Sequence, residues 1–466
     1  MSSIPIHYKS IEEIQNLYIN KTESPLTVTN HFLERIQNVD KDFQSYATVM
    51  FDEAISSAEV LSEQFDSTQK LGGKLFGIPV AVKDLCYTKD IQTMGGTAVL
   101  EGVKPVFDST VVRKLKSAGA IILGKLNLTE GAMGGYNPKR DVPKNPWNRG
   151  KWTGSSSSGS GVATSAGLCV GSLGSDTGGS IRFPSAACGL VGIKPTYGRV
   201  SRYGVLDLAE SLDHVGPMTR NVEDAALILS AISGYDSNDP TSLMEDAPEI
   251  RFLEDLTEFT LGYCEEFAED GVDPEIVKVV KDSLKIFENA GATIKKIDFD
   301  SIDHLLPSWN VLCTAEAFNA HSEYFPSRAD EYGPWFREWL QKGSQVSASE
   351  YIEATKKRLL CNSIINNAFS DIDALVTPTV IRLPHDVDDS ISYGPMDDRR
   401  GTAFQRFTVP FDYNGFPTIS VPAGYSHSGM PLSIQIVGKH MQESTICKIA
   451  ERYQDSVKGI WKNPIP

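Results

Sequence analysis

Two clusters rich in serine and glycine lie close together in the middle of this chain. The first runs from Gly154 to Gly161, and the second, from Gly174 to Pro184, contains Gly178-Gly179-Ser180. Glycines before a serine allow backbone N–H groups to converge on one point, as an oxyanion hole requires. Ser180 is therefore a candidate nucleophile for acyl transfer. A flexible linker is the alternative for the first cluster, but its flanking segments read as packed structure.

A lysine upstream of both clusters is the candidate base. Phe76 to Val82 reads as a buried strand bounded by turn residues, and Lys83 follows it directly. Burial disfavours the charged form of an amine, so Lys83 can lose its proton if it is desolvated. Taken alone, Lys83 would more simply reach solvent or pair with Asp84. Together with Ser180 it makes serine–lysine catalysis possible, with the first cluster as a bridge.

Other kinds of catalytic site have weaker support. The eight histidines show no HExxH or paired spacing for a metal, and no two cysteines have CxxC spacing. The first cluster lacks the Lys-Ser/Thr that ends a phosphate-binding loop, and the second lacks GxGxxG spacing. No GxSxG elbow stands between a predicted strand and a helix. Serine–lysine catalysis remains as the candidate chemistry.

The composition is that of an acidic protein with enough apolar residues for a large core. The chain has 466 residues, of which 41% are hydrophobic, and a formal net charge of −16. Such a chain gains nothing from the release of phosphate counterions, so direct nucleic-acid binding is disfavoured. The N-terminus lacks a secretory h-region, no apolar run approaches the ~20 residues of a membrane span, and seven scattered cysteines favour a reducing compartment. We therefore expect a cytoplasmic protein without membrane contact.

The candidate residues need a scaffold, and the periodicity predicts an α/β one. The length suits one large domain or two to three smaller ones, and no repeat or clear domain linker is present. Apolar spacing and capping residues predict helices over 11–17, 25–36, 54–65, 108–119 (capped by Asp108), 221–234, 274–289, 309–324, 348–369 and 444–453. Short apolar runs predict strands over 76–82, 120–123, 189–195, 260–264, 293–299, 374–378, 418–422 and 432–437. This alternation indicates helices that cover a sheet.

The run from Gly154 to Pro184, with Lys83 upstream in a Val-Lys-Asp context, resembles the amidase signature family. The resemblance extends from about residue 11 to residue 443. It implies one large α/β domain with a central mixed, mostly parallel, twisted sheet covered by helices on both faces. Within residues 1–466 we expect an N-terminal helical cover (1–70), a catalytic core (71–235), a variable substrate-side region (236–405) and a C-terminal return to the sheet (406–466).

The resemblance also implies a catalytic triad and a reaction. Ser180 is the expected nucleophile, Ser156, after a cis peptide bond, the expected proton relay, and Lys83 the expected base. The two serines are 180 − 156 = 24 residues apart, which is the family's typical spacing. Ser155 departs from the family's usual glycine. The implied reaction is hydrolysis of a carboxylic amide to carboxylate and ammonia or amine through an acyl-enzyme, with no metal and no cofactor.

Further residues receive expected roles from the same resemblance. The oxyanion hole is expected from the backbone N–H groups of Thr177, Gly178, Gly179 and Ser180. Charge-assisted hydrogen bonds from Asp176 and Arg182 are expected to order the nucleophile loop. The expected substrate-binding residues are Met133, Gly134, Gly135 and Phe183. Core packing is the alternative for three further candidates to close the pocket, which are Trp309, Phe318 and the Ile381 region.

Two activities fit the resemblance. One is a free-standing amidohydrolase for small aryl or alkyl amides, and the other is the A subunit of glutamyl-tRNA(Gln) amidotransferase, which frees ammonia from glutamine for a partner. Lys194 to Ser242 looks close to this A subunit, but Phe183 replaces its usual glutamine, and Pro395 to Gly401 does not match its acidic glutamine-binding pattern. An apolar ring suits an apolar acyl group better. We favour the free-standing hydrolase over the amidotransferase role or an inactive scaffold, and allow for a homodimer.

Overall fold

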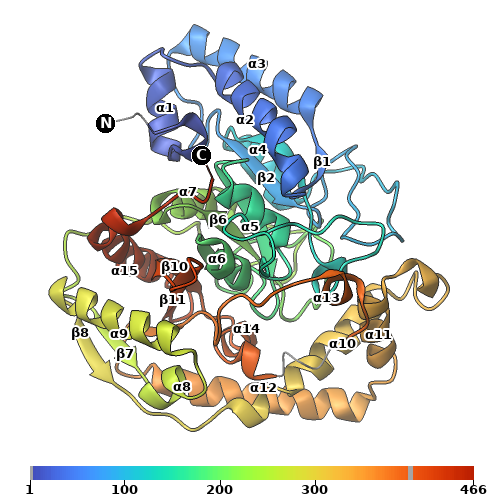
Figure 1. Ribbon diagram of the computed structural model, residues 1–466, viewed down its shortest axis with the longest axis vertical. Helices are drawn as coiled ribbons and strands as arrows, with labels where there is room; N and C mark the ends of the chain where they lie inside the picture. The colour runs from blue at the N-terminus through green and yellow to red at the C-terminus, as the bar shows by residue number, and fades with distance from the viewer. Residues whose placement is uncertain (1–3, 397–401, 466) are drawn as a thin grey trace.

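An eleven-stranded mixed sheet runs through the computed structural model, which describes residues 4–396 and 402–465 (Figure 1). In sheet order the strands are β1 (Tyr46–Val49), β3 (Ile121–Leu126), β2 (Pro79–Lys83), β4 (Gly171–Asp176), β6 (His214–Thr219), β5 (Val191–Lys194), β10 (Thr418–Tyr425), β11 (Pro431–Gly438), β9 (Ala374–Pro378), β7 (Thr260–Tyr263) and β8 (Thr293–Lys296). One sheet thus joins the N-terminal third of the chain to its C-terminal part, and the expected single α/β domain is confirmed.

The direction of the strands corrects one expectation. The β3–β2–β4 and β9–β7–β8 groups are parallel, whereas the other six of the ten neighbouring pairs are antiparallel. A mostly parallel sheet is therefore wrong. Parallel pairing needs a crossover after each strand, but β10 and β11 form a hairpin, and the unpredicted β6 enters between β4 and β5 in the opposite direction.

Helices cover both faces of this sheet. Gly171 and Gly174 of β4 point to opposite faces, because they are an odd number of residues apart. A Cβ at Gly171 would lie 2.7 Å from Ile228 of α7, and one at Gly174 would lie 2.9 Å from the Ser157 hydroxyl at the start of α5. The helices are α1 (Ile11–Ile19), α2 (Pro25–Val39), α3 (Phe51–Thr68), α4 (Thr110–Ser117), α5 (Ser158–Ser165), α6 (Arg182–Cys188), α7 (Val222–Ile232), α8 (Glu265–Glu269), α9 (Pro274–Asn289), α10 (Ser308–Ala320), α11 (Pro334–Gly343), α12 (Ala348–Ala368), α13 (Asp389–Tyr393), α14 (Val409–Tyr413) and α15 (Glu443–Ser456).

Local signals explain where several helices begin. The Ser10 side chain caps α1 in a capping box with Glu13, and Ser24 caps α2 directly before Pro25. The expected cap at Asp108 is wrong, because α4 begins after Ser109. Asp108 instead accepts a hydrogen bond from the Lys89 amide and forms an ion pair with Lys116.

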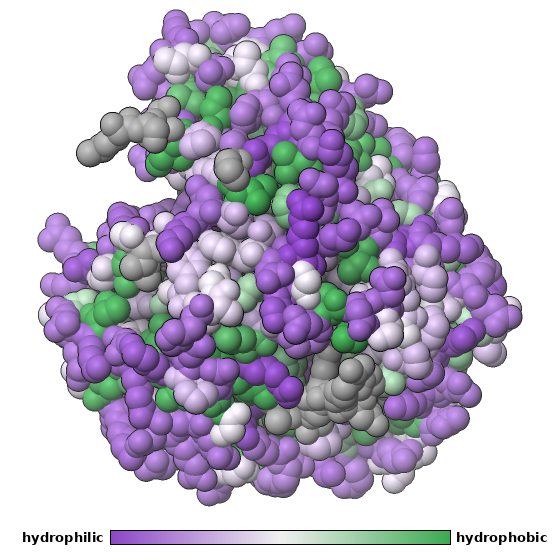
Figure 2. Space-filling model, viewed as in Figure 1, coloured by the Kyte–Doolittle hydropathy of each residue, from purple (hydrophilic) through white to green (hydrophobic). Residues whose placement is uncertain are grey.

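The outer surface is mostly hydrophilic, with apolar side chains in small separate groups on the face that Figure 2 shows. Within residues 4–396 and 402–465, no helix is both long and apolar enough to cross a bilayer.

Candidate active site

Lys83 ends strand β2 in the interior, and its amine is the centre of a small hydrogen-bonded cluster. Its Nζ lies 2.7 Å from the Ser156 Oγ and 2.9 Å from the Ser175 Oγ. The Ser155–Ser156 peptide bond is cis, as the resemblance implies. Burial lowers the pKa of Lys83 to about 7, although the negative charge of Asp213 acts in the opposite direction. A neutral amine can therefore face Ser156 near physiological pH.

The loop that carries Ser156 lies directly beside the candidate nucleophile. The Ser157 amide donates to the Ser180 carbonyl at 3.4 Å, and Ser156 itself is fully buried. Ser180 is partly exposed and lines a large cavity. Its hydroxyl makes no hydrogen bond within the described part of the chain, so the Ser156–Ser180 contact is open in this conformation. Catalytic hydrogen bonds are often long without substrate and tighten in the complex.

Backbone donors face the same cavity. The N–H groups of Thr177, Gly178 and Ser180 have no acceptor among residues 4–396 and 402–465, and all three residues line the cavity. The Gly179 N–H instead donates to the Asp176 carboxylate at 2.6 Å. Gly179 is therefore a poor candidate donor, and three of the four expected N–H groups remain available to an oxyanion.

The carbonyl groups of this loop are fixed from the other side. The Trp309 indole N–H donates to the Thr177 carbonyl at 2.9 Å, and the Thr408 hydroxyl donates to the Gly178 carbonyl at 2.7 Å. Because the C=O and N–H of one peptide point in opposite directions, the Trp309 contact helps to orient the Gly178 N–H, which has no acceptor in the described residues. The Thr408 contact fixes the next peptide, whose Gly179 N–H donates to Asp176. A Cβ at Gly178 would lie only 2.7 Å from the Trp309 ring, so this close approach requires glycine.

A buried ionic network supports the nucleophile loop. Arg182 donates to the Asp176 carboxylate at 3.0 and 2.8 Å, to Asp412 of α14 at 2.7 Å and to the Thr408 carbonyl at 3.0 Å. Although burial alone would raise the pKa of Asp176, the adjacent Arg182 holds it well below its usual range. The network ties the loop to the segment before β10, and so joins distant parts of the chain at the site.

Replacing Arg182 by methionine is expected to lower the free energy of unfolding by about 3–5 kcal/mol, because buried Asp176 and Asp412 lose their shared partner. Chemical denaturation at pH 7 measures this effect. Arg251→Met is the matched control, since Arg251 forms an exposed pair with Glu249, and it should leave stability unchanged within error. An Arg182→Met protein as stable as the wild type would contradict the network's role.

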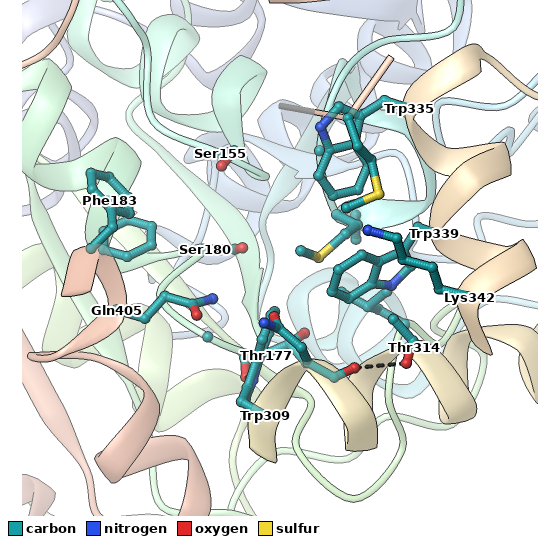
Figure 3. A pocket seen from close by; sticks show the side chains of 18 of the residues that line it. Ser155, Thr177, Ser180, Phe183, Trp309, Thr314, Trp335, Trp339, Lys342 and Gln405 are labelled. Atoms are coloured by element: carbon teal, nitrogen blue, oxygen red, sulfur yellow. Dashed lines mark hydrogen bonds between the residues drawn. The ribbon is translucent and has the colours of Figure 1, made fainter. Parts of the chain in front are cut away.

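The cavity in front of Ser180 has a volume of about 1110 Å³, and its walls partly match the expected pocket (Figure 3). Met133, Gly134, Phe183 and Trp309 line it. The lining does not include Gly135, which packs against Trp335, or Phe318 and Ile381, which pack against the hydrophobic core. Of the Ile381 region, the neighbouring Arg382 does line the cavity. Of the loop from Pro395 to Gly401, Pro395 lines the cavity, and residues 397–401 lie outside the described residues.

The structure adds residues that sequence reasoning missed. Ser175 is the second hydrogen-bond partner of Lys83, and Trp335, Trp339, Lys342 and Phe404 line the cavity. No motif identifies the four cavity residues, because they come from α11 and from the segment before α14. Only the position of Ser175, directly before Asp176 in the second cluster, offered a signal.

One cluster of acidic side chains in the described residues has the spacing of metal ligands. It comprises Glu223 of α7 with Glu451 and Asp455 of α15. None of these residues lines the cavity, so the cluster has no part in the candidate site.

Known proteins with similar sequences and structures indicate the family of this chain. The family model described as Amidase matches residues 27–447. The "Putative amidase AmiD" of Mycobacterium tuberculosis is 37% identical over 444 residues, covering 95% of this chain and 93% of the relative. The A subunit of glutamyl-tRNA(Gln) amidotransferase from Staphylococcus saprophyticus is 35% identical over 477 residues, covering 96% and 97%. A crystal structure of an amidase is 28% identical with a TM-score of 0.85, covering 96% and 99%. The chain therefore belongs to the amidase signature family of hydrolases that act on amides.

Proposed function

We propose that this protein is an amidohydrolase that cleaves carboxylic amides with Ser180 as nucleophile, Ser156 as proton relay and Lys83 as base. The observation that carries this proposal is the 2.7 Å contact between a buried, easily deprotonated Lys83 and Ser156, beside a cavity that exposes Ser180. The proposed catalytic groups all come from residues 71–235, and residues 236–405 supply much of the cavity wall.

The proposed reaction has two halves. Neutral Lys83 takes the proton of Ser156 while Ser156 takes that of Ser180, and the Ser180 Oγ bonds to the amide carbonyl carbon. The negative oxygen is stabilised by the N–H groups of Thr177, Gly178 and Ser180. The C–N bond then breaks, and the amine leaves with the proton returned through Ser156. In the second half, water gives a proton through Ser156 to Lys83 and attacks the acyl carbonyl carbon. The bond between that carbon and the Ser180 Oγ then breaks, and Ser180 takes the proton back as the carboxylate leaves.

The lining of the cavity favours an apolar amide over glutamine. The Phe183 ring lies tilted against the Phe404 ring, with 4.7 Å between ring centroids, close to the nucleophile. The one acidic residue among the described lining residues is Asp386, which pairs with Lys151 at 2.8 Å. A glutamine substrate would need a carboxylate for its ammonium group. The amidotransferase function remains the second candidate, because that relative matches nearly the whole chain.

A panel of amides separates these two candidates. The purified chain, without any partner, is assayed for ammonia release from aryl amides, alkyl amides and glutamine. Turnover of apolar amides without turnover of glutamine supports the free-standing amidohydrolase. Release of ammonia from glutamine alone, or only with a co-purified partner that binds tRNA, would overturn it in favour of the amidotransferase function.

A further inference from the structure

The cavity has two aromatic walls with Ser180 between them. Figure 3 shows Phe183 and Gln405 on one side of Ser180, and Trp335, Trp339 and Lys342 on the other. The Trp335 and Trp339 rings stack, with 5.5 Å between their centroids. Flat apolar walls of this kind bind apolar or aromatic groups. A cavity of about 1110 Å³ also exceeds the space that a small amide fills, so it has room for a substrate that extends well beyond the scissile bond.

Helix α11 supplies the wall that contains Trp335 and Trp339, and it also carries Lys342. Trp335, Trp339 and Lys342 are four and three residues apart, which places them on one face of the helix, and all three line the cavity. Buried Glu130 fixes the start of this helix, because its carboxylate accepts the Gly333 N–H at 2.8 Å and the Asn137 side-chain amide at 2.7 Å. These contacts fix where the backbone of α11 begins, at the opposite end of the helix from Lys342.

Lys342 is an exposed lysine of the cavity lining. No carboxylate lies within 4.0 Å of its Nζ in the described part of the chain, and the acidic residue of the lining, Asp386, already pairs with Lys151. The buried Trp339 indole N–H also lacks an acceptor among these residues. Buried donors normally have partners. The Lys342 ammonium and the Trp339 indole N–H thus both lack a partner among the described residues, and both residues line the cavity. In a chain of net charge −16, these two donors point to an anion that comes with the ligand.

We propose that the cavity takes amides with an aromatic or apolar body and a carboxylate remote from the scissile bond, and that Lys342 binds this carboxylate. One ammonium group matches one carboxylate, and the rings of Trp335 and Trp339, on the same side of the cavity as Lys342, cover the body of the substrate. The inference rests on the proposed amidohydrolase function, since it places the scissile amide at Ser180.

A binding experiment tests this selectivity without turnover. Ser180→Ala protein is titrated by calorimetry with two primary amides, 3-(4-carboxyphenyl)propanamide and 3-(4-nitrophenyl)propanamide. The nitro group has the shape of the carboxylate but no net charge. The carboxylate compound is expected to bind about five- to tenfold more tightly, as for a partly exposed charge-assisted contact. This ratio should fall to about one when Lys342→Met is added, and should invert with Lys342→Glu. Lys357→Met, which removes an exposed lysine of α12 away from the cavity, should keep the ratio.

The outcomes separate this inference from the proposed function. Equal binding of the two compounds, no binding of either, or a ratio that Lys342→Met leaves intact would overturn the role of Lys342, whatever the wild-type enzyme hydrolyses. Absence of ammonia release from both compounds by the wild type, with the binding preference intact, would overturn the proposed reaction and keep the carboxylate site.

Discussion

Ser180→Ala protein is expected to lose amide hydrolysis by a factor of at least about 10⁴ while it keeps its fold and its ability to bind substrate. The factor is large because the hydroxyl supplies the atom that bonds to the carbonyl carbon, and residual catalysis can come only from the oxyanion donors and binding. Ammonia release over hours measures the residual rate, with protein purified apart from wild-type material.

Stability and a neighbouring serine provide the controls for this variant. Ser180 is partly exposed at the cavity and its hydroxyl has no hydrogen bond in the described residues, so its loss should leave the melting temperature unchanged within error. Ser155→Ala removes another hydroxyl that lines the cavity next to the cis peptide bond, and should retain far more activity than Ser180→Ala. If Ser180→Ala protein turned over amides at a rate close to the wild type, Ser180 would not be the nucleophile.

Lys83→Met is expected to lower kcat/KM by about 10²–10⁴-fold, which is the usual contribution of a general base. Burial lowers the pKa of Lys83 to about 7. Below that pH the amine holds a proton and cannot accept one from Ser156. The wild-type kcat/KM should therefore rise with pH through about 7 and level off above about pH 8. The rate of Ser180 modification by a fluorophosphonate, measured from pH 5.5 to 9, should follow the same curve.

A second group near the site requires its own control. Burial also raises the pKa of Asp213 to about 7, and this carboxylate accepts a hydrogen bond from the Thr177 hydroxyl at 2.5 Å. Asp213→Asn should keep the rise in fluorophosphonate reactivity with pH, whereas Lys83→Met should abolish it. A rise that survives in Lys83→Met and disappears in Asp213→Asn would assign the titration to Asp213 and remove Lys83 from the role of base.

The proposed catalytic residues could be predicted from the sequence, because they lie in short contiguous motifs. Lys83 at the end of a strand and the glycines before Ser180 have a chemical reason that is visible in their neighbours. The backbone N–H groups that can stabilise an oxyanion were only partly predictable. That the Gly179 N–H points to Asp176 depends on how the loop turns after β4, which residue types alone do not determine.

Strand β4 shows why parts of the fold escaped prediction. Its sequence, Gly-Ser-Leu-Gly-Ser-Asp over 171–176, has no β-branched or aromatic residue, so propensity argues against a strand. The structure requires small residues there, because α5 and α7 approach its two faces so closely. Tertiary packing therefore overrides local preference, and Ser175 reaches Lys83 only through the pairing of β4 with β2.

The cavity wall could not be predicted because it depends on contacts between distant segments. Trp335 and Trp339 follow helical spacing that is equally typical of a core-facing helix. Their place in the cavity follows from the packing of α11 on α10 and from the hydrogen bond that the Gly333 N–H donates to the Glu130 carboxylate, 203 residues away in the sequence. Lys342 likewise has no local feature that distinguishes it from any other surface lysine.

The acyl-enzyme on Ser180 can be trapped during turnover. Wild-type protein that is turning over an aryl amide is quenched in acid and digested, and its peptides are sequenced by tandem mass spectrometry. The peptide that contains Ser180 is expected to carry the added mass of the acyl group. No acylated peptide is expected from Lys83→Met protein quenched at the same time. An acyl group on Ser156 or another residue, or continued turnover with no acylated peptide at any quench time, would contradict the role of Ser180 as nucleophile.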